Sequence, residues 1–207
     1  MTLMAQARAE REDLRDLLGT LSPEQWRAPS LCAGWSVRDV VAHVLSYEEL
    51  SGRELAGRLA RGRFTVDRSN AIGLRELSAL TAAQLIGLLD EHLTPAGLTA
   101  GMGGRIALTD GMIHQQDIRR PLGLPRAIPS ERLLPALRTA LVAPTLLGAL
   151  RVRGVRLVAT DIDWTFGRGP ELRGTGEAIL MTVAGRGAAL AELSGDGRER
   201  VARRLGP

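Results

Sequence analysis

Lysine is absent from the 207-residue chain, and all 27 basic side chains are arginines. Together with the abundance of Ala, Gly and Leu, this one-sided choice indicates the coding bias of a GC-rich genome. Because 23 acidic residues are interspersed among the arginines, the net charge is only +4. No basic block with interleaved aromatic residues occurs, so the composition argues against a nucleic-acid-binding protein despite a pI of about 10.7.

Cysteine and long apolar runs are also scarce. The single cysteine, Cys32, excludes a disulfide framework and a zinc site built from several cysteines, and it is interpreted as a small packing residue. Every apolar run is shorter than the ~18 residues that a membrane-spanning helix needs. The charged segment 1–15 lacks the apolar stretch of a secretory leader. We therefore expect a cytoplasmic protein with no membrane partner.

Aromatic residues make up only 3% of the chain while hydrophobic residues make up 44%, so the core must consist of Leu, Ala, Val and Ile. This composition favours helices. Apolar periodicity predicts the first helices, and Ser36 with Asp39 resembles a capping box at the start of the second. The predicted helices cover 3–19, 37–62, 69–93 with an interruption near Leu80, 106–119 and 130–143.

The pattern changes near residue 150. Residues 155–160 alternate like a strand, and two further short strands are predicted at 164–166 and 171–174. Helical patterns return at 176–185 and 187–194. The sequence thus predicts an α+β protein with a helical domain over 1–150 and a small domain over 151–207, which carries a short, mainly antiparallel sheet.

One predicted helix carries an unusual polar face. Asp110, His114 and Asp117 are spaced i, i+4 and i+7, which places all three on one side of a helix. Such a face is costly to bury unless its groups are paired or bind a metal. Two interpretations remain open. One is a divalent metal site, and the other is an Asp–His hydrogen bond with Asp117 paired to Arg119 or Arg120.

The remaining histidines differ in their surroundings. His43 lies in the apolar segment 40–45, so we expect it at or near the core, where it can serve as a structural residue or as a ligand from a second helix. His92 follows two acidic residues near a predicted helix end, which is typical of a surface position.

Several segments together resemble the mycothiol-dependent maleylpyruvate isomerase family, which occurs in actinobacteria. The resemblance rests on Gln25-Trp26, Pro29-Ser30-Leu31-Cys32, the run Gly34-Trp35-Ser36-Val37-Arg38-Asp39-Val40-Val41-Ala42-His43, and the stretch from His114 through Asp117-Ile118-Arg119-Arg120 to Leu122-Gly123. Degenerate matches continue through Val155–Thr160, Trp164, Gly174, Ala184-Gly185-Arg186 and 193–197. The resemblance covers nearly the whole chain.

The resemblance implies a DinB-like, up-down four-helix bundle followed by a small domain akin to sterol-carrier folds. It implies a metal, usually zinc, held by His43, Asp110 and His114. Asp110 departs from the family, which has the longer glutamate there. Asp117 matches a position that is commonly acidic in the family, and it is our candidate for the residue that orients His114. Arg186 corresponds to a basic residue of the small domain, with an expected role in gripping a carboxylate of the thiol cofactor or the substrate.

The resemblance further implies a metal-bound thiolate of mycothiol that attacks a small electrophilic substrate. The expected activity is an isomerisation or an S-transfer. A non-catalytic small-ligand-binding or regulatory protein with a degraded metal site is the alternative. An arginine-driven nucleic-acid or partner-binding adaptor is a third hypothesis. Either a monomer or a homodimer agrees with the sequence.

Overall fold

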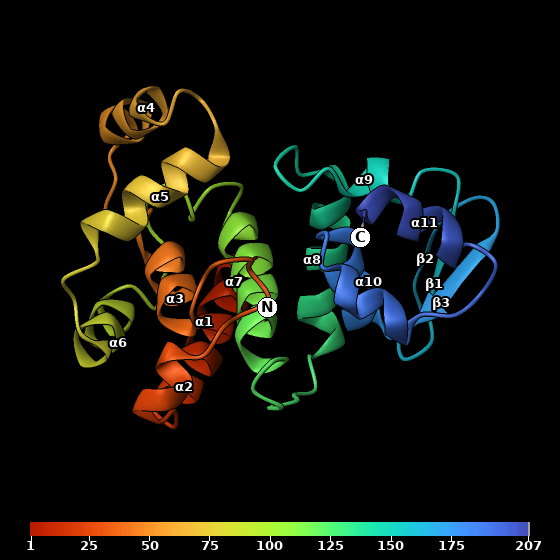
Figure 1. Cartoon of the computed structure of the whole chain (residues 1–207), viewed down its shortest axis with the longest axis horizontal. Helices are drawn as coiled ribbons and strands as arrows, with labels where there is room; N and C mark the ends of the chain where they lie inside the picture. Colours follow the sequence, from red (N-terminus) through yellow and green to blue (C-terminus); the bar gives the residue numbers. More distant parts are fainter. Residues whose placement is uncertain (207) are drawn as a thin grey trace. The chain divides into compact units, whose positions relative to one another are not determined.

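The computed structural model describes residues 1–206, which form two compact units, Met1–Pro125 and a second unit that begins at Arg126. The N-terminal unit is helical, and its elements follow one another along the red-to-green part of the chain (Figure 1). They are α1 (Leu3–Leu18), α2 (Pro23–Arg27), α3 (Val37–Leu45), α4 (Gly52–Arg61), α5 (Val66–Glu76), α6 (Ala82–Glu91) and α7 (Arg105–Arg119).

Four of these helices form a closed bundle. Helix α1 packs against α7, α7 against α3, α3 against α6, and α6 against α1. The core is aliphatic, as the composition predicted, with Trp26 as its aromatic member. Its largest fully buried side chains in this unit are Leu14, Leu18, Leu85, Leu89, Leu108, Met112 and Ile118. This arrangement confirms the predicted helical bundle, and it places the inner faces of α3 and α7 against each other.

The single long helix predicted over 37–62 is wrong, because the chain turns between α3 and α4. Ser46 ends α3 by donating its hydroxyl to the carbonyl of His43. Ser51 then begins α4 with a capping box in which Glu54 bonds back to the Ser51 backbone. The buried guanidinium of Arg58 donates to the Ser46 carbonyl and so satisfies the broken helix end.

The C-terminal unit combines helices with a small sheet. Its elements are α8 (Ser130–Val142), α9 (Gly148–Arg151), β1 (Arg156–Ala159), β2 (Thr165–Gly167), β3 (Glu171–Gly174), α10 (Gly176–Val183), the 3-10 helix η1 (Gly187–Glu192) and α11 (Arg198–Leu205). The strand order is β2-β1-β3. The predicted α+β class is confirmed, but the sheet is mixed rather than mainly antiparallel, because β1 pairs antiparallel with β2 and parallel with β3.

The units divide earlier than the predicted boundary near residue 150. Helix α8 packs against α10, whose residues other than Glu177 are buried, and against α9, so its apolar face belongs to the C-terminal core. The short helices α9 and α11 and the 3-10 geometry of η1 were not predicted. Within residues 1–206, each helix is too short or too polar to cross a membrane.

Candidate metal centre

His43 lies in the last turn of α3 with its ring directed at other aromatic side chains. Helix α3 begins at a capping box in which Ser36 and Asp39 bond reciprocally, as the sequence predicted. The His43 side chain is buried, and its ring centroid lies 5.1 Å from the Trp35 ring and 5.9 Å from the Tyr47 ring. The ring is therefore held between side chains from both ends of its helix.

The polar face predicted on α7 is present. His114 is buried, and its Nδ1 atom lies 2.9 Å from Oδ2 of Asp117, whose side chain is fully buried. Its Nε2 atom lies 3.5 Å from Oδ1 of the half-exposed Asp110. One imidazole therefore faces a carboxylate at each ring nitrogen, and the two ring nitrogens have different surroundings.

Histidines from α3 and α7 converge. The His43 and His114 ring centroids are 4.7 Å apart, with the planes at 78°. One ligand atom from each of His43, Asp110 and His114 can be chosen so that all three lie within 4.8 Å of one another. Two imidazoles and a carboxylate are a donor set that suits a divalent ion and leaves coordination positions open, so these residues fit the predicted metal. Their role as ligands stays a prediction.

The electrostatics of the site favour a positive charge at His114. Burial alone lowers the pKa of His114. The negative charge of Asp110, together with hydrogen bonds to Asp110, Asp117 and Cys32, outweighs this and holds the pKa well above its ordinary value. The carboxylates of Asp110 and Asp117 therefore stabilise a positive charge at the His114 ring, whether a proton or a metal ion carries it.

Cys32 is a neighbour that the sequence analysis did not place here. Its thiol donates to Oδ2 of Asp117 at 3.1 Å, and its Sγ lies 3.8 Å from Nδ1 of His114. The contact depends on how the loop before α3 folds onto α7. The backbone hydrogen bond from the Leu31 amide to the carbonyl of Asp117 helps to fix that approach, and it leaves no periodic signal in the sequence.

Tyr47 and Arg58 were also missed. The Tyr47 ring lies edge-on to His43, and its hydroxyl donates to Asn70 at 2.7 Å. The Arg58 guanidinium lies 5.0 Å above the Tyr47 ring. Burial raises the pKa of the Tyr47 phenol, Arg58 opposes that shift, and the charge of Asp110 supports it. These groups extend the polar surroundings of His43 towards α4 and α5.

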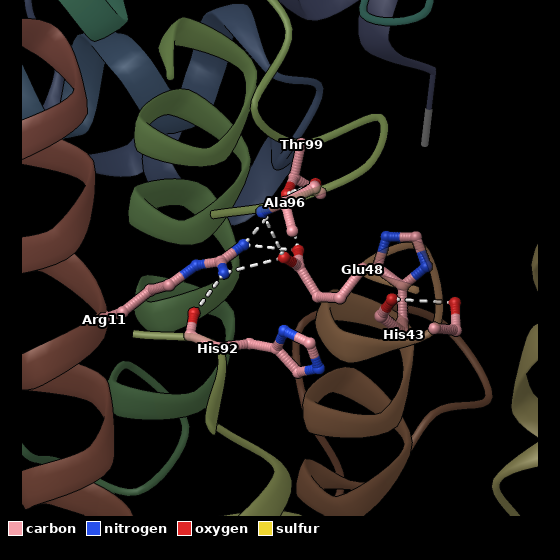
Figure 2. Close-up of polar contacts among 7 residues, drawn as sticks. Arg11, His43, Glu48, His92, Ala96 and Thr99 are labelled. Carbon is pink, nitrogen blue, oxygen red and sulfur yellow. Dashed lines mark hydrogen bonds and ion pairs between the residues drawn. The ribbon is translucent and has the colours of Figure 1, made fainter. Parts of the chain in front are cut away.

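A buried ion pair braces the segment that follows α3. Arg11 of α1 binds Glu48 through both guanidinium ends, at 2.5 and 2.9 Å, and both side chains are buried. Figure 2 shows these two side chains pointing at each other, with Thr99 and the Ala96 backbone also directed at the carboxylate. Arg11 donates further to the carbonyl of His92. The pair therefore links α1, the end of α3 and the loop before α7.

Part of the chain is similar to a known protein family. Residues 7–100 match the model of the family described as the mycothiol maleylpyruvate isomerase N-terminal domain. The matched segment lies within the N-terminal unit. The resemblance found in the sequence is thereby confirmed, and the match includes His43 but ends before α7.

Two solved structures share the fold. They are the crystal structures of the mycothiol-dependent maleylpyruvate isomerase and of a histidine-to-alanine mutant of it. Each has a TM-score of 0.56 and 13% sequence identity, and covers 94% of this chain and 91% of that chain. At this identity the likeness concerns the fold. No curated protein matches the chain.

Asp110 and Arg186 are the two remaining residues that the family resemblance predicted for the site. Asp110 stands where maleylpyruvate isomerase relatives were expected to carry glutamate, yet its carboxylate still reaches the His114 ring. Arg186 lies in the C-terminal unit between α10 and η1, is partly buried, and donates to the carbonyl of Ala184. Its expected role towards a cofactor or substrate carboxylate stays a prediction.

Proposed function

We propose that the chain is a metal-dependent enzyme that uses mycothiol to isomerise, or to transfer sulfur to, a small electrophilic substrate. The observation that carries this proposal is the convergence of His43, His114 and Asp110 on one point from two packed helices. The match of residues 7–100 to the mycothiol maleylpyruvate isomerase N-terminal domain supports mycothiol as the thiol.

His43, Asp110 and His114 are the proposed ligands of a divalent ion, with zinc as the expected metal. A bound ion of this kind lowers the pKa of a coordinated thiol and presents it as a thiolate at neutral pH. Asp117 accepts a hydrogen bond from Nδ1 of His114, which fixes the ring and leaves Nε2 directed towards Asp110 and His43. The tautomer that binds through Nε2 is therefore set by a buried carboxylate.

The thiolate sulfur is the proposed nucleophile. When bound, mycothiol would supply a thiolate able to add reversibly to a conjugated double bond, which is the chemistry that an isomerisation requires. In an S-transfer the sulfur displaces a leaving group and stays on the product. Tyr47 and Trp35 flank His43, and we assign them to the wall against which the substrate is positioned. Arg186 is assigned to a carboxylate of the thiol or of the substrate.

The alternative is a non-catalytic protein that binds a small ligand without a metal. Asp110 favours this alternative, because its side chain is shorter than the glutamate expected in the family. Its Oδ1 atom lies 3.5 Å from Nε2 of His114, and the side chain is half exposed. The two hypotheses differ in metal content, since only the enzyme requires about one ion per chain.

The decisive experiment combines elemental analysis with a mycothiol-dependent assay. We expect purified protein to contain one divalent ion per chain and to consume or isomerise an electrophile such as a cis-configured unsaturated dicarboxylate only when mycothiol is present. His43→Ala is expected to lose both the ion and the activity while keeping its helical circular dichroism. A folded, metal-free wild-type protein without thiol-dependent activity would instead establish the binding protein.

A further inference from the structure

The Nδ1 side of His114 carries a second group of potential metal ligands. Cys32 Sγ, His114 Nδ1 and an Asp117 carboxylate oxygen all lie within 4.8 Å of one another. The measured separations are 3.1 Å from sulfur to the Asp117 oxygen, 3.8 Å from sulfur to the ring nitrogen, and 2.9 Å from the nitrogen to the oxygen. This group shares only His114 with the proposed ligand set around His43.

The loop 29–36 holds the thiol in this position. Its ends are joined by a bridge between Pro29 and Ser36, and the Leu31 amide donates to the carbonyl of Asp117 at 3.0 Å. The Ser30 hydroxyl accepts from the Cys32 amide and donates to the Trp35 carbonyl. The loop is therefore tied both to itself and to α7, and Cys32 reaches Asp117 without any rearrangement.

The arrangement does not suit a cysteine nucleophile. In a Cys–His–Asp relay the thiol and the carboxylate contact opposite ring nitrogens, so that the imidazole passes a proton between them. Here Cys32 and Asp117 both face Nδ1 of His114. The carboxylate at the opposite nitrogen, Asp110, is a proposed ligand of the first ion. The thiol lies closer to the Asp117 oxygen (3.1 Å) than to Nδ1 (3.8 Å), so it donates to the carboxylate rather than to the ring, and the three atoms converge on one point.

The separations agree with metal coordination. With bond lengths of about 2.3 Å for sulfur and about 2.0–2.2 Å for nitrogen and oxygen, tetrahedral ligands stand about 3.3–3.6 Å apart. The three observed separations differ from these values by about half an ångström or less. Cys32 is partly exposed and precedes the exposed Ala33 and Gly34, so an ion has access from solvent.

We propose that Cys32, His114 and Asp117 form a second metal position, selective for thiophilic divalent ions. Binding forms bonds from the ion to Sγ, Nδ1 and a carboxylate oxygen, and the thiol proton and the Nδ1 proton pass to solvent. A neutral imidazole offers one lone pair at a time. The second position therefore competes with the His43 position for His114, and a soft ion such as cadmium favours the side that carries the thiolate.

The test uses cadmium and the purified full-length chain without added thiol. Because Cys32 is the only cysteine, any thiolate-to-cadmium charge-transfer absorption reports this position alone. We expect the absorption to appear with one equivalent of cadmium and to vanish in Cys32→Ser. We expect Asp117→Asn to weaken cadmium affinity by about 10-fold or more, and His114→Ala to weaken it further.

Two results would overturn the proposal. One is the absence of the absorption in the wild-type protein. The other is an absorption whose midpoint is unchanged in Asp117→Asn and His114→Ala, which would mean that a lone thiol binds cadmium adventitiously. His43→Ala is the matched control. This substitution removes the proposed catalytic ion, so we expect it to abolish activity while the cadmium absorption persists. The activity assay therefore tests the proposed function, and the cadmium absorption tests the second metal position.

Discussion

The imidazole rings of His43 and His114 meet edge to face, with their centroids 4.7 Å apart. They come from α3 and α7, which pack directly against each other in the bundle. Asp110 adds a carboxylate oxygen 3.5 Å from Nε2 of His114. The site is therefore built by the packing of α3 against α7.

Asp110 is expected to act as a ligand despite its short side chain. Asp110→Asn removes the negative charge but keeps the shape, so we expect zinc affinity to fall by more than the roughly 10–100-fold typical of an outer-shell change. Asp110→Glu restores the carboxylate and is expected to retain most of the affinity. Competition with a chromophoric chelator measures both constants. Equal affinities in Asp110→Asn and the wild type would show that Asp110 does not bind the ion.

The metal-free protein is expected to lose stability as the pH rises. The pKa of His114 in the folded chain is held well above its unfolded value, chiefly by the charge of Asp110 acting against burial. A raised folded pKa contributes stability that is fully present below the unfolded value of about 6.5 and disappears as pH rises through the folded value. Urea unfolding of chelator-treated protein measured from pH 6 upwards checks this.

His114→Gln is the control for the pH experiment. It keeps a polar side chain but cannot titrate, so the decline above pH 6.5 should be smaller in this variant. If the two proteins show parallel pH profiles in that range, the imidazole between the carboxylates is not charged in the folded state.

The buried Arg11–Glu48 pair is expected to be sensitive to the loss of one partner. Glu48→Gln leaves the Arg11 guanidinium buried without a counter-charge, and such a change costs about 3–5 kcal/mol of unfolding free energy. The double variant Arg11→Met with Glu48→Leu removes both charges and should recover part of that loss. Chemical denaturation of the wild type, Arg11→Met, Glu48→Leu and the double variant gives the coupling energy. Strictly additive losses would show that the pair does not interact.

Two tryptophans of the N-terminal unit should differ in their stability effects. Trp26 is 6% exposed and belongs to the core, so Trp26→Ala is expected to cost about 3–5 kcal/mol. Trp35 is only partly buried against that core, so Trp35→Ala should lower the free energy of unfolding by less than Trp26→Ala does. Its ring lies against His43, so Trp35→Ala should disturb zinc affinity instead. A larger stability loss at Trp35 than at Trp26 would contradict this division.

Much of the site could be predicted because its residues lie on regular helices. The spacing of Asp110, His114 and Asp117 determines their common face once α7 is helical, and the apolar context of His43 places it at the core. The family resemblance then paired the two histidines, which periodicity alone could not do.

The errors arise where tertiary contacts override local pattern. The apolar run through residue 45 continues into a helical pattern, and the sequence gives little warning that Arg58 folds back onto the Ser46 carbonyl. The approach of Cys32 to Asp117 depends on an irregular loop. Helix α8 has the same amphipathic pattern as the helices of the bundle, so only its packing on α10 assigns it to the C-terminal unit.

The most direct test is X-ray absorption at the zinc edge of protein loaded with one equivalent of zinc. Cys32→Ala is the suitable background, because it removes the competing thiolate. We expect two imidazole nitrogens at about 2.0–2.1 Å from zinc, and we expect this two-imidazole signal to be lost in the same protein with His43→Ala, which no longer holds the ion. A spectrum without histidine ligands, or one that His43→Ala leaves unchanged, would contradict the claim that α3 and α7 hold one ion between them.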